Sequence, residues 1–175
     1  MPIYEFETRQ PDIYPSAYIA PSATIIGDVT IESECYVGDG AILRGDYGAI
    51  KIGRGTAVEE GVIIHARPND KTVIGERVTI GHGAMIHNAV IEDEAVIGMR
   101  ATISDYSRVG RGAIIGEMTL VKNQQEIAPE SIAVGVPARI VGPVKEHQRA
   151  LWTAGKDLYI DLTHRYPKGL KLLKR

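Results

Sequence analysis

Residues 74–103 read IGERVTIGHGAMIHNAVIEDEAVIGMRATI, and an aliphatic side chain returns every six positions in this stretch, with one shortened step. The same spacing extends along most of the chain, with a slip of three residues after Leu43 and a longer interruption over Ala66–Val73. Four residues after the aliphatic position, each uninterrupted hexad carries a small or β-branched side chain, and glycine often follows the aliphatic residue directly. The aliphatic positions are Ile19, Ile25, Ile31, Val37, Leu43, Ile52, Val58, Ile64, Ile74, Ile80, Ile86, Ile91, Ile97, Ile103, Val109, Ile115 and Val121.

A period of six matches neither an amphipathic helix, with a period of 3.6, nor a plain strand, with a period of 2. Short strands joined by tight corners do give it: three hexads form one triangular coil, and coils stack about 4.8 Å apart through parallel pairing. We expect the aliphatic and small side chains to fill the prism, and glycine to tolerate the corner backbone. The pattern resembles the hexapeptide-repeat superfamily, which implies a left-handed parallel β-helix.

The composition divides the chain into two parts. Its 175 residues include 37 Ile and Val against 8 Leu, and six of those Leu lie at or beyond Leu151. Because β-branched residues favour strands and Leu favours helices, we expect an all-β domain over residues 1–143 and a C-terminal α-helix over 144–175 that packs on it. Ile132–Val141 is predicted to be a closing strand with a Gly-Val-Pro turn. Gly155 is a candidate interruption of the helix, Pro167 its predicted end, and Lys168–Arg175 a frayed end.

The overall charge and cysteine content exclude several classes of function. With 20 basic and 22 acidic side chains, the net charge of −2 offers no electrostatic argument for nucleic acid or an anionic membrane as partner. No apolar run approaches the ~20 residues of a membrane span, and no leader opens the chain. The single cysteine, Cys35, excludes an internal disulfide and fits a reducing cytoplasm, so we expect a cytoplasmic protein with Cys35 as a core filler.

Three histidines have an informative phase in the repeat. His65 and His87 each directly follow an aliphatic position, and the two positions are three hexads apart. They are therefore expected at the same position of adjacent coils, about one strand spacing apart. This separation suits two ligands of one metal with bonds of about 2.0–2.1 Å. His82 comes two residues after its aliphatic position and points off another side, so it can join only from a neighbouring subunit. A triangular prism then favours a homotrimer with metal sites at its interfaces.

Charged residues cluster around these histidines. Arg44 and Asp46 are placed on the face of the pair, whereas Glu59 and Glu60 are placed on the face of His82. Isolated surface charges are usually only solvated, but this clustering favours a site. Three neutral imidazoles leave one open position on a tetrahedral metal, which lowers the pKa of bound water to about 7. Nearby carboxylates can orient the imidazoles or move protons.

Several motifs resemble the gamma-class carbonic anhydrases and the ferripyochelin-binding-protein-like homologues. They are Ala41–Asp46 (AILRGD), Val62–His65 (VIIH), Ile80–His87 (IGHGAMIH), Gly135–Arg139 (GVPAR) and the Trp152…Tyr159-Ile-Asp-Leu…Tyr166 tail. The resemblance implies a trimer whose metal is held by His65 and His87 of one subunit and His82 of the next, with Arg44 and Asp46 paired across that interface. It also implies zinc, with ferrous iron or cobalt as alternatives, and a tail tyrosine, Tyr159, that reaches the site.

The chain also departs from that family. Where the family usually has Gln-Asp-Asn before the first histidine, this chain has Glu59-Glu60-Gly61, and Glu59 cannot donate as an amide does. A tryptophan common before the Arg-Gly-Asp stretch is Gly38 here. The acidic loop that shuttles protons in the archetype is expected to be absent, because the stretch after His65 is short, and Asp70 is a weak substitute for it.

These observations favour a metal-dependent carbonic anhydrase, a lyase that hydrates CO2 to bicarbonate by metal-bound hydroxide, with Glu59, Glu60, Arg44, Asp46 and Tyr159 as candidate catalytic residues. No organic cofactor site is expected. One alternative is thioester hydrolysis or acyl transfer on the same metal site. Another is a non-catalytic trimer that binds metal or a ferric siderophore.

Overall fold

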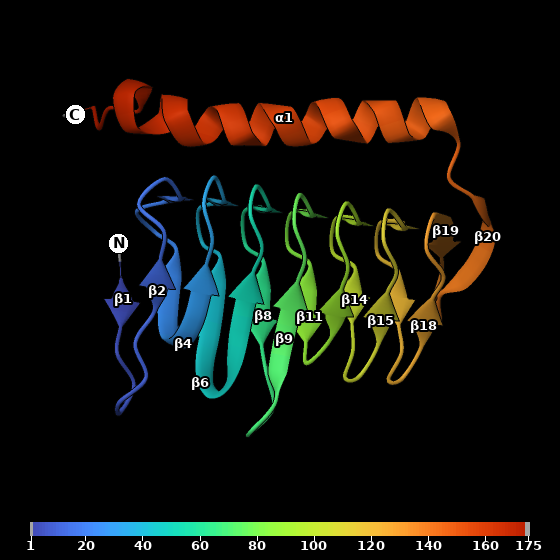
Figure 1. Cartoon of the computed structure of the whole chain (residues 1–175), viewed down its shortest axis with the longest axis horizontal. Helices are drawn as coiled ribbons and strands as arrows, with labels where there is room; N and C mark the ends of the chain where they lie inside the picture. The colour runs from blue at the N-terminus through green and yellow to red at the C-terminus, as the bar shows by residue number, and fades with distance from the viewer. Residues whose placement is uncertain (1, 174–175) are drawn as a thin grey trace.

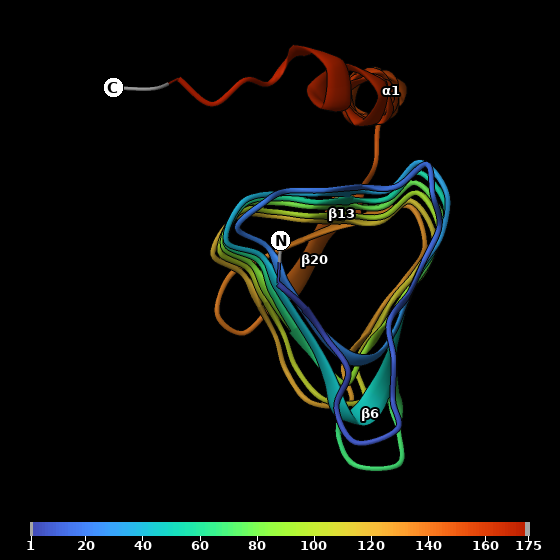
Figure 2. The same cartoon turned by 90° about the vertical axis from the view of Figure 1, so that its left-hand side faces the viewer.

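The computed structural model describes residues 2–173, which form a left-handed parallel β-helix followed by one long helix (Figure 1). Viewed along its axis, the β-helix has a triangular outline with three flat faces (Figure 2). The stacked strands pair in parallel, each residue lying beside its counterpart in the next coil. The expected coil of three hexads is therefore confirmed.

We call the three faces A, B and C. β4 and β6 run continuously from face A onto face B. β6 pairs with β8 on one side of the corner and with β9 on the other, and β4 pairs with β6 on both sides. Face C carries seven parallel strands and ends in the antiparallel strand β20. Face A contains the first parts of β4 (Thr24–Ile31) and β6 (Ile42–Ile52), with β8 (Ile63–His65), β11 (Met85–His87), β14 (Thr102–Ile103) and β17 (Leu120–Val121). Face B contains the second parts of β4 and β6, with β9 (Lys71–Ile74), β12 (Val90–Ile91), β15 (Arg108–Val109) and β18 (Glu126–Ile127). Face C contains β3 (Tyr18–Ile19), β5 (Tyr36–Val37), β7 (Ala57–Val58), β10 (Thr79–Ile80), β13 (Val96–Ile97), β16 (Ile114–Ile115), β19 (Ser131–Val134) and β20 (Arg139–Pro143). β1 (Ile3–Tyr4) and β2 (Asp12–Ile13) pair with β4 at the N-terminal end.

The six-residue repeat fills the inside of the prism. The largest fully buried side chains are almost all the aliphatic positions of the repeat, from Ile25 to Ile103. The small positions between them, such as Ala41 and Ala101, are equally buried. Cys35 is one of these: its Sγ lies 3.1 Å from the carbonyl oxygen of Gly53, and burial raises its pKa to about 12. Cys35 is thus the core filler that its phase predicted.

The glycines that follow the aliphatic residues have a different role from the one expected. A Cβ at Gly53 or Gly98 would lie only 2.6 Å from backbone atoms of the next coil, so glycine is needed for close approach between coils. The left-handed backbone occurs two residues after this position. Both glycine and larger residues adopt it there, since Gly40 has φ +70° and Glu94 has φ +60°. The prediction that these glycines serve the corner conformation was wrong, because the corner accepts larger residues and the space beside the next coil does not.

The C-terminal segments also differ in detail from the prediction. Ile132–Val141 is not one strand but most of an antiparallel hairpin, formed by β19 and β20 around the predicted Gly-Val-Pro turn. The helix α1 (Glu146–Gly169) passes through Gly155 without a break and contains Pro167 in its last turn. Residues 174–175 of the predicted frayed end lie outside the described residues, and the part from Leu170 is not helical.

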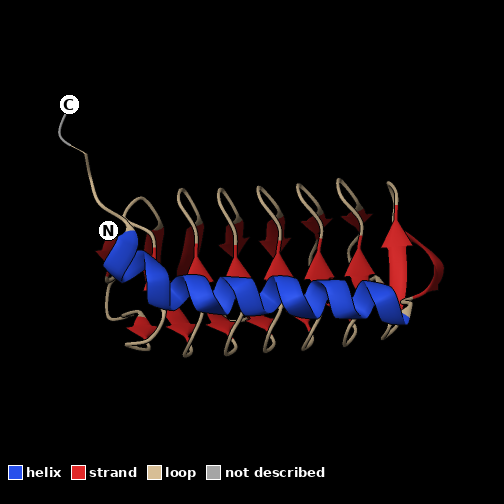
Figure 3. Cartoon of the chain, turned by 90° about the horizontal axis from the view of Figure 1, so that it is seen from above, coloured by secondary structure: helices blue, strands red, loops and turns tan. Residues whose placement is uncertain are grey.

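Helix α1 lies along face C and runs back toward the N-terminal coils (Figures 1 and 3). Two tyrosines of the helix pack on two of the sheet: the rings of Tyr159 and Tyr36 are 5.1 Å apart, and those of Tyr166 and Tyr18 are 5.0 Å apart. The buried Lys156 donates to the carbonyl oxygen of Glu94 at 2.6 Å. The helix therefore packs on its own chain. No helix in residues 2–173 is both long and apolar enough to cross a membrane.

Candidate functional site

His65 and His87 lie side by side at the corner between faces A and B. They are direct partners in the β8–β11 register, as the repeat predicts. His65 Nδ1 and His87 Nε2 are 3.0 Å apart, so the two rings present nitrogens to one another. Two nitrogens that bind one tetrahedral metal with bonds of 2.0–2.1 Å are about 3.3 Å apart, so a small opening of this pair fits one metal ion.

Each ring of this pair is held by a carboxylate on its other nitrogen. Asp46 Oδ1 lies 2.9 Å from His65 Nε2, and Asp105 contacts His87 Nδ1. Burial alone would raise the pKa of Asp46, but hydrogen bonds from His65 and Arg44 outweigh it and lower that pKa. Both carboxylates are thus suited to orient an imidazole, because a metal-bound histidine commonly donates its other ring N–H to a carboxylate.

Asp105 and Arg67 were not anticipated. The Arg67 guanidinium donates to Asp105 Oδ2 at 2.6 Å, and this bond, followed by the bond to His87, lowers the pKa of the Asp105 carboxyl. Asp105 comes two residues after Ile103, on the coil that follows His87, so the phase of the repeat could have placed it there. Arg67 lies in the interruption of the repeat, where phase gives no position.

His82 belongs to a second cluster at the corner between faces C and A. Its Nδ1 lies 2.7 Å from Glu60 Oε2, and its Nε2 lies 3.1 Å from Glu59 Oε2. Glu59 also accepts a bond of 3.0 Å from the backbone N–H of His82. To bind a metal, one ring nitrogen of His82 has to leave its carboxylate.

Two tyrosines connect this second cluster to the packing of α1. Tyr36 donates to Glu60 Oε1 at 2.8 Å, and the ring of Tyr159 packs on that of Tyr36. Burial raises the pKa of Glu59; the side chains of Tyr159 and His82 offset this only in part. The structure therefore places Tyr159 beside the second cluster, where burial raises the pKa of Glu59 above its usual value.

Arg44 occupies the slot beside His65 one coil earlier, as predicted. Its guanidinium forms an ion pair with Asp46 of the same chain. The resemblance implies an ion pair between Arg44 of one subunit and Asp46 of another, whereas in this structure the two residues pair within a single chain.

The two histidine clusters flank the same face of the prism. In chain order, His82 precedes β11 on face A and His87 ends it. Within residues 2–173, one chain gathers no three His, Cys, Asp or Glu side chains in an arrangement that could hold a metal. A three-histidine site thus requires a second copy of the chain and stays a prediction.

Asp70, the substitute considered for a proton shuttle, is tied into the loop that follows β8. Its Oδ2 accepts from Asn88 Nδ2 at 2.9 Å, and this bond is the main cause of its lowered pKa. A carboxyl with a lowered pKa is a weak proton acceptor at neutral pH.

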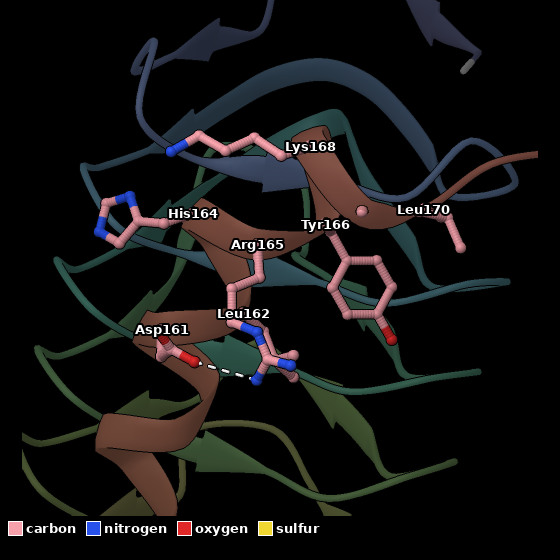
Figure 4. Close-up of a pocket in the computed structure, with 8 residues that line it drawn as sticks. Asp161, Leu162, His164, Arg165, Tyr166, Lys168 and Leu170 are labelled. Carbon is pink, nitrogen blue, oxygen red and sulfur yellow. Dashed lines mark hydrogen bonds and ion pairs between the residues drawn. The ribbon is translucent and has the colours of Figure 1, made fainter.

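One hollow adjoins the second cluster, and another is lined by no residue of either cluster. The first, of about 370 Å³, begins at Glu59 and His82 and continues beneath α1. The other, of about 700 Å³, lies at the end of α1 between Asp161 and Leu170, where Arg165 donates to Asp161 at 3.2 Å (Figure 4). The three site histidines line only the first of these hollows, and only through His82.

The parallel β-helix and its repeat define a protein of the hexapeptide-repeat class, and residues 71–105 match the model of the bacterial transferase hexapeptide family. The chain belongs to the family that contains the carnitine operon protein CaiE. It is 35% identical to CaiE of Proteus sp. over 97% of this chain and 86% of that protein, and 36% identical to CaiE of Escherichia coli K12 over 85% and 76%.

Two solved structures are similar over nearly their full length. The BC4754 gene product of Bacillus cereus, provisionally described as an acetyltransferase, is 31% identical with a TM-score of 0.91, over 94% of this chain and 95% of that one. A hexapeptide transferase family protein from Anaplasma phagocytophilum is 27% identical with a TM-score of 0.90, over 94% and 98%. These relatives indicate an enzyme of the hexapeptide transferase family.

Proposed function

We propose that the chain is a metal-dependent carbonic anhydrase, a lyase that reversibly hydrates CO2 to bicarbonate at the interfaces of a homotrimer. The observation that carries the proposal is the pair His65 and His87, with facing nitrogens 3.0 Å apart and a carboxylate on each ring. His82 of the next subunit would complete the ligand set. Zinc is the metal we expect, with ferrous iron or cobalt as alternatives, because imidazole suits all three.

The surface of face A supports the trimer. Ile42, Ile63 and Met85 form a stripe in register, and they are 37%, 39% and 45% exposed in the single chain. Since the two clusters lie at the two edges of this face, a cyclic assembly with face A toward the axis brings His82 of one chain to His65 and His87 of its neighbour. Burying the stripe would also remove apolar surface from water.

The residues of the chain have distinct roles in this proposal. His65 and His87, with His82 of the next subunit, would hold the metal ion, which would supply a hydroxide nucleophile at neutral pH when bound. Asp46 and Asp105 fix the orientation of the paired rings. Glu59 accepts a hydrogen bond from the backbone N–H of His82 and holds that residue in place, and Glu60, whose side chain is 40% exposed, can pass a proton to solvent. Tyr159 packs on the ring of Tyr36, which donates to Glu60.

Stopped-flow CO2 hydration, with zinc, iron and cobalt each loaded and with several pH values, tests the proposal. We expect activity that requires metal and is abolished in His82→Ala. If the protein hydrates no CO2 with any of the three metals, carbonic anhydrase is excluded as its function.

Thioester hydrolysis or acyl transfer at the same site is the second candidate. The relative from Bacillus cereus favours it, because at 31% identity it is provisionally described as an acetyltransferase. Release of thiol from short acyl thioesters, in samples without CO2 hydration, would support this candidate. A metal-loaded trimer inactive in both assays would instead favour a non-catalytic trimer that binds metal or a siderophore.

A further inference from the structure

The segment that follows α1 leaves the prism on which the helix packs. Near the end of α1, the ring of Tyr166 still lies 5.0 Å from that of Tyr18 in β3, the first strand of face C. From Leu170 the chain is no longer helical, and it runs out past the corner between faces C and A (Figure 2). Because an extended chain covers about 3.3–3.6 Å per residue, residues 170–173 can reach roughly 13 Å beyond the helix.

We call residues 168–173 the tail, and its side chains are both apolar and basic. Leu170, Leu172 and Leu173 are 57%, 98% and 83% exposed, and the side chains of Lys168 and Lys171 are exposed beside them. Single exposed leucines are common on protein surfaces, but contiguous exposed apolar side chains mark interaction sites. Three leucines within four residues therefore indicate a partner that covers the tail.

The N-terminal segment, residues 3–12, has the complementary chemistry. Residues 5–11 join β1 on face A to β2 on face B, so they cross the corner between these two faces in the first coil. The N-terminal segment contains three carboxylates and one guanidinium, and Glu5 and Glu7 are exposed. Tyr4 and Phe6 are 53% and 37% exposed. This corner thus presents negative charge together with apolar surface.

Within one chain the tail and the N-terminal segment lie at different corners of the prism, but the proposed homotrimer brings them together. The tail passes the corner that carries His82, and the N-terminal segment crosses the corner that carries His65 and His87. In the trimer, the first of these corners meets the second corner of the neighbouring chain. His82 and His87 belong to one coil, so neighbouring prisms stand level, as closed cyclic symmetry requires. The tail and the N-terminal segment, both at the first coil, then meet as well.

We propose that the tail of each subunit docks on the N-terminal segment of the neighbouring subunit, with its leucines against Tyr4 and Phe6 and its lysines beside Glu5 and Glu7. The inference rests on the proposed function only for the homotrimer, and on neither the metal nor the reaction. Opposite charge, exposed apolar side chains on both partners and their common level along the prism support a second copy of the chain as the occupant.

Disulfide formation between chains tests the contact. In the double variant Phe6→Cys/Leu172→Cys, mild oxidation should link each chain to the next and give covalent trimers on a denaturing, non-reducing gel. Each single variant should give dimers at most. The native Cys35 is buried, and its pKa of about 12 keeps it unreactive.

The matched control is Glu126→Cys/Leu172→Cys, which places the second cysteine on the same corner-bounded face B but at its C-terminal end. This variant should give no covalent trimers. If the Phe6→Cys/Leu172→Cys chains stay at monomer mass while the native protein has the mass of a trimer, the proposal is overturned.

Trimer stability gives a second, independent measurement. A chain that ends after Gly169 lacks the last six residues, so the concentration at which half of the trimer dissociates should rise at least about tenfold in sedimentation. Lys168→Glu/Lys171→Glu should raise it about two- to tenfold, and adding Glu5→Lys/Glu7→Lys should reverse most of that rise, because the charges are again opposite. A truncated chain that assembles like the parent would also overturn the proposal.

Further results separate this inference from the proposed function. If covalent trimers form but CO2 is not hydrated, the tail contact stands and carbonic anhydrase is excluded. If CO2 is hydrated by a trimer that does not cross-link, only the tail contact is refuted. A parent that is monomeric at every concentration refutes both. If the parent binds vesicles of phosphatidylcholine and phosphatidylglycerol, and truncation after Gly169 abolishes that binding without altering the trimer, a lipid surface covers the tail and the proposal is overturned.

Discussion

Gly98→Ala tests the close stacking of coils. A Cβ at Gly98 would lie 2.6 Å from the backbone nitrogen of Glu117, whereas ordinary contacts begin near 3.4 Å, so the two coils would have to separate by about 0.8 Å. That movement strains the bond of 2.8 Å from Gly98 N–H to the carbonyl of Ile115. Overpacking costs about 1–3 kcal/mol and a weakened hydrogen bond about 1 kcal/mol, so we expect a loss of about 3 kcal/mol.

Two control variants separate this clash from other properties of glycine. Gly40→Ala has φ +70° but no atom within 3.9 Å of the new Cβ, so it should cost only about 1–2 kcal/mol. Gly155→Ala lies in α1 with no atom within 4 Å, and it should stabilise by about 0.5–1 kcal/mol. The assay is thermal and urea unfolding at one protein concentration. For a chain of this size we expect Gly98→Ala to lower Tm by about 6–12 °C. A loss no larger than that of Gly40→Ala would refute the reasoning.

Three other predictions concern the site. Glu59→Gln should raise CO2 hydration in stopped-flow assays, because it restores an amide donor; a loss of activity would instead show that the Glu59 carboxylate takes part. Asp105→Asn should weaken metal binding about 10–100-fold in chelator competition, since His87 loses its orienting carboxylate, and unchanged affinity would contradict that role. Burial, followed by the bond to Glu60, raises the pKa of Tyr36 above its unfolded value near 10, so its contribution to stability is present below pH 10 and is lost as the pH rises further. The unfolding free energy of the parent minus that of Tyr36→Phe should therefore fall above pH 10, and a constant difference would argue against the shift.

The repeat was enough to predict the coil, the buried positions and the register of His65 with His87. All three depend only on the position of a residue within the six-residue repeat, because each position returns to the same place on a regular prism after three hexads. Phase also placed Arg44 beside His65 and Glu60 one coil before His82, where its carboxylate contacts the His82 ring.

Features that depend on side-chain direction or on irregular backbone were beyond that reasoning. Arg67 reaches Asp105 from a loop that interrupts the repeat, so no phase assigns its position. The continuity of α1 through Gly155 depends on packing against face C, since propensity alone disfavours glycine in a helix. The role of Gly98 required the distance between coils, which a sequence pattern does not contain.

The central claim is that each metal site takes two histidines from one chain and one from the next. Metal content of mixed oligomers tests it directly, using His82→Ala and the double variant His65→Ala/His87→Ala, each of which alone should hold no metal. Unfolded together in equal amounts and reassembled as random trimers, they should regain about one quarter of a metal ion per chain, since each mixed trimer completes one interface. Mixtures that bind no more metal than the separate variants, in preparations where the parent binds one ion per chain, would contradict the claim.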